Sequence, residues 1–581
     1  MKLRALVVGS VALATLAACS KQPAPAAPAP TNQSAHDGHA APPAAGPRTT
    51  LLGNLGAYQR PIKTTHADAQ KFFDEGLTLL YGFNHEESFA SFERAAALDP
   101  ASPMPHWGMS LALGTNINDV APAERLKQGY AHLAEAEKRK GAGSDVEQGL
   151  VAALGQRYVD LDKPQGLSPR DFTTEQAKRE QAYSDAMGAL SQRFPEDLDV
   201  TTLHAESMMN LRPWRLYKKD GTPEPGTEAI VAALEGVMKR NPQHPGANHY
   251  YIHAVEASKR PDRATVSAGR LETLVPGAGH LVHMPAHIYI RTGQYAKSAK
   301  SNADAAAVDE KYFKATGANG FYATMYYGHN LQFESAAAMF AGNLAQAQSA
   351  AQRTVKLADP IADQMVMLEP FAAQELAVAT RFGMWGLALE QKPPAATRVV
   401  QTSFYHFARG AALVGMGQPG DADAELAALK QAAAKIPKDA MVGAANTAMD
   451  VIAVAIADLT ARIAEGKGDT AGAIAGFKKA VAAEDQLGYN EPPDWLIPER
   501  ERLGAVLLKL GKHADAEKVF RADLAKNVGN PRSLYGLWRS LEAQKKAGAA
   551  ATKAAFDQAW AGADVALNDD LYSTRREFRS G

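Results

Sequence analysis

The chain repeats itself at a fixed spacing, and this repetition limits the folds that it can adopt. From Thr65 onward it reads as short amphipathic helices separated by glycine-containing turns, without the apolar–polar alternation of strands. Equivalent positions in the first helices of neighbouring helix pairs are 34 residues apart at Ile252 and Ala286, Leu376 and Gly410, and Gly504 and Trp538. A single pair cannot bury its apolar face alone, so successive pairs must stack. The sequence therefore predicts an all-α solenoid of stacked antiparallel helix pairs.

The residue order within a pair agrees with this spacing. A small residue, an aromatic residue, a second small residue and a proline follow one another at Gly76, Phe92, Ala95 and Pro100. Together with the 34-residue step, this order resembles the tetratricopeptide repeat (TPR) family. The resemblance covers most of residues 66–562 and implies roughly eleven or twelve pairs with a concave groove formed mainly by the first helices. Insertions are expected near residues 212–226, 308–328 and 390–400.

The N-terminus reads as an export signal. Lys2 and Arg4 precede an apolar run too short to span a bilayer, and the run ends in Leu-Ala-Ala-Cys at Cys19. This ending resembles a bacterial lipoprotein signal, which implies lipidation of Cys19, and Ser20 after it implies the outer membrane of a Gram-negative bacterium, facing the periplasm. An ordinary signal peptide with an incidental cysteine is the alternative. We expect residues 1–19 to be the signal peptide, 20–49 an unfolded Pro/Ala linker, and 50–581 the helical superhelix.

Histidines recur in register with the repeat. His249 and His253 are four residues apart and share a helix face with Glu256. Adding 34 to each histidine number gives His283 and His287, so equivalent positions of adjacent first helices carry imidazoles. These positions lie three before and one after the small anchor residue of each repeat, and the resemblance to the TPR family implies that their side chains point into the groove.

Two further histidines extend this group. His280 and His329 each lie six residues before the small residue that anchors their repeat. Helix axes about 8–10 Å apart allow imidazoles from neighbouring helices to meet at an ion with bonds of about 2.0–2.1 Å. The expected metal ligands are His249, His253, Glu256, His280, His283, His287 and His329. Imidazole and carboxylate without thiolate suit a divalent transition metal, Zn, Cu, Fe or Ni, whose identity the sequence does not specify.

A metal is not the only explanation of these histidines. Groove histidines can hydrogen-bond a peptide or each other instead. Pro285 complicates the local geometry, because it either kinks a helix interior or begins a helix, which would leave His280 and His283 on the preceding loop.

Three other residues are candidates for ligand binding. Glu491 and Trp495 flank two prolines that fix an extended approach to the groove, and Glu206 is assigned a groove position. The alternative for Glu491 and Trp495 is a rigid loop between repeats, with the tryptophan filling the core.

Composition and motifs narrow the function. Lys and Arg total 62 against 63 Asp and Glu, so the net charge of −1 gives no reason to expect a nucleic-acid partner, and the single cysteine excludes a disulfide framework or a cysteine-based metal site. His85-Glu86 begins like a metalloprotease motif, but Phe89 occupies the position of the second histidine.

Three hypotheses remain. The first is an envelope-anchored binding protein whose groove carries a transition metal and accepts a protein or peptide ligand. The second is a metal-dependent periplasmic hydrolase or oxidase, with Glu256 or Glu491 as general base and its other catalytic residues unknown. The third is a metal-free adaptor that assembles envelope proteins. The fold alone does not decide among them.

Overall fold

The structure is a computed structural model that describes residues 49–161 and 169–567. The expected signal peptide, with Cys19, and nearly all of the expected linker lie outside the described residues. Leu55 and Ile62, which precede the first helix, are buried. Within the described residues the chain is α-helical, without an extended strand. None of these helices is both long and apolar enough to cross a membrane.

In residues 49–161 and 169–567 the helices form twelve consecutive pairs, within the range expected from the repeat spacing. The first six pairs are α1 (Ala67–Tyr81) with α2 (His85–Leu98), α3 (Met104–Ala112) with α4 (Ala123–Arg139), α5 (Asp145–Leu154) with α6 (Pro169–Arg193), α7 (Leu198–Asn210) with α8 (Thr227–Arg240), α9 (Pro245–Val255) with α10 (Thr265–Leu274), and α11 (Gly279–His283) plus α12 (Pro285–Arg291) with α13 (Tyr295–Thr316). The last six are α14 (Tyr327–Ala341) with α15 (Leu344–Ala358), α16 (Glu369–Ala372) plus α17 (Gln374–Phe382) with α18 (Trp385–Glu390), α19 (Val399–Gly415) with α20 (Ala422–Ala433), α21 (Ala448–Gly466) with α22 (Thr470–Glu484), α23 (Glu499–Lys509) with α24 (His513–Lys526), and α25 (Pro531–Ala543) with α26 (Ala549–Ala559). Each pair also packs on its neighbours, which makes the molecule a TPR-like α-solenoid.

Glycines end many first helices and a side-chain cap starts the next. Gly342 follows α14 with a φ of 76°, a left-handed conformation that a β-carbon disfavours. Asn343 then accepts a hydrogen bond from the backbone N–H of Gln346 and caps α15. The same arrangement joins α21 to α22 through Gly468 and Asp469. These turns reverse the chain within two or three residues.

Small residues of the first helices receive aromatic rings of the second helices. The Phe92 ring lies between Gly76 of its own pair and Gly108 of the next, and a β-carbon on Gly76 would stand 2.7 Å from the ring. Phe520 has the same relation to Gly504 and to a glycine of the following pair, which is Gly536. Gly504 and Gly536, the two glycines that contact Phe520, are therefore 32 residues apart. The sequence instead predicted Trp538 as the residue equivalent to Gly504. Trp538 lies one half-turn further along α25, where it is half-buried and packs against Phe556.

The expected insertions near residues 212–226 and 390–400 are present, and the one near 308–328 is shorter than predicted. The chain leaves helical structure between α7 and α8 and between α18 and α19. Around residues 308–328, however, α13 continues to Thr316, and a π-helical turn, Tyr322–Tyr326, leads directly into α14. The interruption there is confined to residues 317–321.

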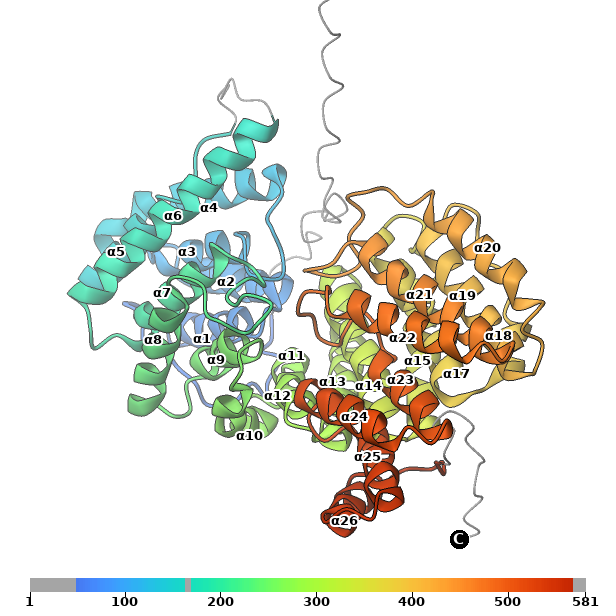
Figure 1. The fold of residues 1–581 in the computed structure, drawn as a ribbon. Coiled ribbons are helices and arrows are strands. Elements are labelled where there is room, and N and C mark those ends of the chain that lie inside the picture. The colour runs from blue at the N-terminus through green and yellow to red at the C-terminus, as the bar shows by residue number, and fades with distance from the viewer. Residues whose placement is uncertain (1–48, 162–168, 568–581) are drawn as a thin grey trace, which may run out of the picture.

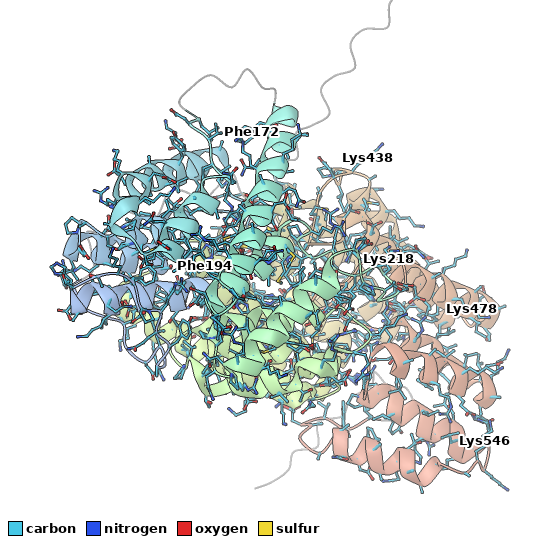
Figure 2. All side chains as sticks on the ribbon, turned by 90° about the vertical axis from the view of Figure 1, so that its left-hand side faces the viewer. Phe172, Phe194, Lys218, Lys438, Lys478 and Lys546 are labelled. Carbon is cyan, nitrogen blue, oxygen red and sulfur yellow. The ribbon has the colours of Figure 1, made fainter. Side chains whose placement is uncertain are left out.

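The solenoid curls so that its two halves face each other. The N-terminal pairs, blue to teal in Figure 1, and the orange helices α19–α22 lie on either side of α11–α14, and the red helices α24–α26 lie below them in that view. The Tyr295 hydroxyl donates a hydrogen bond of 2.9 Å to the carbonyl oxygen of Val528, so the turn before α13 contacts the turn after α24. Exposed lysines such as Lys438, Lys478 and Lys546 project from the outer surface of the C-terminal half (Figure 2). Between the halves lies a cavity of about 2270 Å³.

Gly504→Ala tests the small–aromatic packing. The added β-carbon would stand 2.5 Å from the Phe520 ring, and overpacking of a filled core costs about 1–3 kcal/mol. We therefore expect a lower midpoint in urea denaturation followed by circular dichroism. Gly386→Ala is the matched control, since it also lies in a helix but has no atom near the added carbon, and its effect should stay within about 1 kcal/mol and tend to stabilise. Equal losses in the two variants would contradict the packing described.

Candidate metal centre

Six histidines from four helices meet below the floor of the central cavity. His249 and His253 come from α9, His280 and His283 from α11, His287 from α12 and His329 from α14. Sequence analysis expected these side chains to point into the groove; in the structure five of them are buried, with exposed fractions of 0% for His249 and His283, and His329 is half-buried.

Pro285 explains how one short stretch supplies three of these rings. It occupies the first position of α12, where its missing N–H costs little, and Met284 joins α11 to α12 in helical conformation. Both of the earlier alternatives are thus partly correct: Pro285 begins a helix, and His280 and His283 lie on a separate helical turn before it. The break sets α11 and α12 at different directions toward the cluster.

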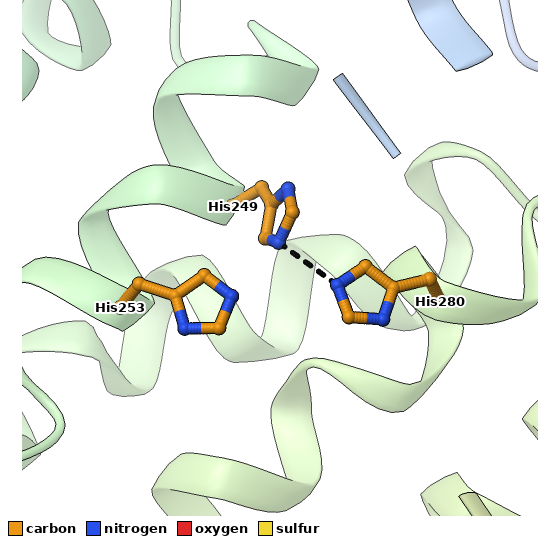
Figure 3. A group of neighbouring side chains, drawn as sticks. All are labelled: His249, His253 and His280. Carbon is orange, nitrogen blue, oxygen red and sulfur yellow. Dashed lines mark hydrogen bonds between the residues drawn. The ribbon is translucent and has the colours of Figure 1, made fainter. Parts of the chain in front are cut away.

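The first histidine group consists of His249, His253 and His280 (Figure 3). The Nε2 atoms of His249 and His280 lie 3.2 Å apart. His249 Nδ1 lies 2.6 Å from the carbonyl oxygen of Tyr81, and His253 Nδ1 lies 3.0 Å from Glu256 Oε1. His253 Nε2 and His280 Nδ1 are buried and have no hydrogen-bond partner in the described protein.

The second histidine group consists of His283, His287 and His329. The Nε2 atoms of His283 and His287 lie 2.9 Å apart, and the His329 ring centre lies 4.8 Å from that of His283. His283 Nδ1 lies 2.6 Å from Asn302 Oδ1, on α13. The Asn302 amide nitrogen donates to the carbonyl oxygen of Ser298, which leaves Oδ1 toward the histidine.

Glu256 and Glu491 face the Nδ1 side of the imidazoles. His287 Nδ1 lies 2.7 Å from Glu491 Oε2 and 3.0 Å from Glu256 Oε2. Tyr489 donates a short hydrogen bond to the other oxygen of Glu491. These two carboxylates and His287 form a third possible metal-binding group. Glu256, expected as a metal ligand, thus lies both beside the imidazoles and in a group that could hold an ion.

These contacts fix the tautomers of the rings. A carbonyl, amide or carboxylate oxygen only accepts, so each Nδ1 that faces one carries the proton. The Nε2 atoms of His249, His253 and His283 then hold lone pairs directed at the other imidazoles. In His287 the proton is likewise on Nδ1 and the lone pair on Nε2, unless the ring carries a second proton. Buried lone pairs that face one another are unfavourable without a proton or a cation between them.

Burial keeps most of these rings neutral. It lowers the pKa of His249, His280 and His283 well below the usual range, and the neighbouring imidazoles lower it further. Burial followed by the charge of His287 lowers the pKa of His329 to about 3. Neutral imidazole is the form that binds metals.

His287 differs because two carboxylates surround it. Burial opposes its protonation, but Glu256 and Glu491 outweigh burial and raise its pKa to about 10. Burial likewise opposes ionisation of Glu256, but the histidines outweigh it and hold the pKa of Glu256 below its usual range. Burial raises the pKa of Glu491. A proton on His287 therefore balances part of the negative charge of the carboxylates beside it.

Phe83 and Glu491 lie between the histidine cluster and the cavity. Both line the cavity, as do Tyr326 and Arg291. The Phe83 ring centre lies 4.6 Å from that of His249 and 5.5 Å from that of His280. Phe83 adopts a φ of 56°, a left-handed conformation rare for an aromatic residue and frequent at functional sites.

Sequence reasoning missed several residues of the site. Tyr81 contributes only its backbone carbonyl, and Phe83 and Asn302 belong to no recurrent pattern. The hint at Phe83 was the preceding Gly82, which ends α1 three residues before α2 begins. Asn302 follows His283 by 19 residues on the second helix of the same pair, a spacing without a recognised motif.

The three expected ligand-binding residues have different positions. Glu491 reaches the cluster, as described. Trp495 lines the cavity but is buried, packed edge-to-face against Phe407 and donating to Glu499, which agrees with the alternative of a core residue. Glu206 lies in a separate buried network on α7, where it accepts a hydrogen bond from Asn210, and it is not among the residues that line the cavity.

No protein family and no curated protein matches this sequence. Among solved structures, the chain is similar to one titled Naa15/Naa10 bound to HypK-THB, with 12% identity over 88% of this chain and 90% of that one, at a TM-score of 0.24. Yeast Tom70 shows 11% identity over 84% of this chain and 91% of its own, also at 0.24. These scores are too low to support an argument, so the fold assignment depends on the helix packing itself.

A double-mutant cycle of His287→Ala and Glu491→Ala tests the contact across the two halves. Removing one partner of a buried ion pair typically costs about 3–5 kcal/mol. In metal-free protein we expect each single variant to lose stability and the double variant to lose at least about 1 kcal/mol less than their sum, measured by urea denaturation. The exposed pair Lys300 and Asp304 is the control cycle, with a coupling below about 1 kcal/mol. Additive losses at His287 and Glu491 would show that the contact does not form.

Proposed function

We propose that this protein binds a transition metal through the histidines of the cluster, within a TPR-like scaffold. The observation that carries the proposal is the polarity of the rings. Separate acceptors hold the Nδ1 protons of His249, His253 and His283, so the metal-binding Nε2 atoms face inward. Outer partners of this kind orient the histidines of known metal sites.

The spacing of the nitrogens supports the same function. Two nitrogens bound to one ion at about 2.0–2.1 Å lie about 2.8–3.4 Å apart at square or tetrahedral angles. The Nε2 pairs of the two groups lie 3.2 Å and 2.9 Å apart. A nitrogen-rich site without thiolate fits Cu, Zn, Ni or Fe, and Cu²⁺ binds such donors most strongly.

The cavity favours a second role beside metal binding. Its volume of about 2270 Å³ exceeds what a metal ion alone requires, and Glu491 contacts both the cavity and His287. We propose that a protein or peptide segment enters it and that the metal takes part in recognition. The position of Glu491 between the cavity and His287 also favours the alternative candidate, a metal-dependent hydrolase or oxidase. In that enzyme Glu491 would hold a proton beside the bound substrate.

We also propose that Cys19 anchors the protein by a lipid to the outer membrane, on the periplasmic side. The support is the Leu-Ala-Ala-Cys sequence that ends the apolar N-terminal run. A lipid with the first residues of the mature chain would place the solenoid at the membrane surface without inserting any helix. Cys19→Ala should abolish incorporation of labelled palmitate and move the protein to the soluble envelope fraction. Unchanged fractionation of that variant would refute the anchor.

Metal retention tests the main proposal. Untagged protein, exposed to Zn, Cu, Fe, Ni and Mn in competition and desalted, should retain one element in at least stoichiometric amount by inductively coupled plasma mass spectrometry. His253→Ala with His287→Ala should lose it. His406→Ala, which removes an imidazole paired with Glu425 outside the cluster, should retain it. Absence of every metal from the parent protein would refute the proposal.

Asn302→Ala tests the orienting contacts. His283 would lose the acceptor that fixes its tautomer, and loss of such outer partners weakens metal affinity by about 10–100-fold. Competition with a chromophoric chelator measures the change. Asn343→Ala, which removes the cap of α15, is the control that should reduce stability without changing affinity. An unchanged affinity in Asn302→Ala would mean that His283 is not a ligand.

A further inference from the structure

We infer that the cluster is a two-metal centre, with one ion held by His249, His253 and His280 and a second by His283, His287 and His329. This inference rests on the proposed metal binding and adds the number of ions. It requires that the two groups be distinct, that each be sufficient for an ion, and that they be adjacent.

The two groups are distinct. Within each, one nitrogen per ring lies within 4.8 Å of the others, and no residue belongs to both groups. Each group has its own close Nε2 pair, 3.2 Å in the first and 2.9 Å in the second. Two separate points of convergence are therefore present.

Each group is sufficient to hold an ion. Three protein ligands with an open fourth position are the usual complement of a catalytic zinc site. In the first group His253 Nε2 is buried without a partner, and it completes the triad with the close pair of His249 and His280. In the second, the half-buried His329 completes the triad from α14, with ring centres 4.8 Å and 5.9 Å from those of His283 and His287.

The groups are adjacent, because rings of one contact rings of the other. The ring centres of His253 and His287 lie 5.5 Å apart, and so do those of His280 and His283. These distances fall within the range found inside the groups, 4.7 Å for His283 and His287 to 6.3 Å for His253 and His280. Two ions in these positions would be close neighbours.

Glu256 connects the two groups. Its Oε1 lies 3.0 Å from His253 Nδ1, in the first group, and its Oε2 lies 3.0 Å from His287 Nδ1, in the second. A single carboxylate thus orients one imidazole of each triad. Its negative charge, with that of Glu491 beside His287, also offsets part of the charge of two cations. Glu256 Oε2 makes no hydrogen bond within the described residues, and Glu256 also belongs to a third possible metal-binding group, with His287 and Glu491.

Copper stoichiometry combined with spin counting tests the inference. Full-length untagged protein is titrated with Cu²⁺ in the presence of glycine, which competes for weak surface sites. We expect two tightly bound copper ions per chain. The electron paramagnetic resonance signal should rise with the first equivalent and then fall short of the total copper as the second ion couples to the first. This readout uses only the parent protein, so it does not depend on the folding of any variant.

Single-group variants locate the two ions. His253→Ala and His283→Ala should each bind one copper with a signal that accounts for all of it, and the combined variant should bind none. His406→Ala should behave as the parent, and circular dichroism verifies the fold of each protein. One copper in the parent, lost in both single variants, would overturn the two-metal centre but keep the metal-binding proposal. Two ions unaffected by these substitutions, or two without magnetic coupling, would also overturn it. No bound copper, zinc or nickel in the parent would refute metal binding itself.

Discussion

The geometry of the site depends on one kind of contact, the hydrogen bond from a buried Nδ1–H to a fixed oxygen. A buried imidazole must satisfy its polar nitrogens or lose stability. Here the acceptors are the Tyr81 carbonyl, Asn302, Glu256 and Glu491, and each holds one ring at a set angle. Because these acceptors come from α1, α13, the end of α9 and the segment before α23, the cluster forms only where the superhelix has the right curvature.

The sequence predicted the parts of this molecule that depend on local periodicity. The 34-residue spacing led to stacked helix pairs of about the observed number, and the same spacing linked His249 to His283 and His253 to His287. Both depend on which residues share a helix face, which a sequence specifies directly. The small departure at Gly536, where the repeat step is 32 residues, shows that ring-to-glycine contact, rather than exact spacing, determines the packing.

The sequence did not predict what depends on curvature over long distances. The acceptors at Tyr81 and Asn302 follow no repeat position, and the Phe83 contact with three imidazoles joins α1 to α9 and α11. The burial of the histidines was also missed. Periodicity shows which face of a helix points toward the inside of the superhelix, but it does not show whether that face is exposed in the groove or covered by other residues. Glu206, assigned to the groove on an uncertain register, belongs instead to a network with Asn210.

The contact between His287 and Glu491 has a consequence for the order of assembly. The two residues are separated by 204 positions, so during synthesis all six histidines emerge from the ribosome long before the carboxylate that faces His287. Pairing over such a separation requires a costly loop closure and follows the stacking of local helix pairs. The imidazoles therefore come together first, and Glu491 completes the site only when the last pairs have docked. A chain that ends before residue 491 would keep all six histidines of the cluster and lack this contact.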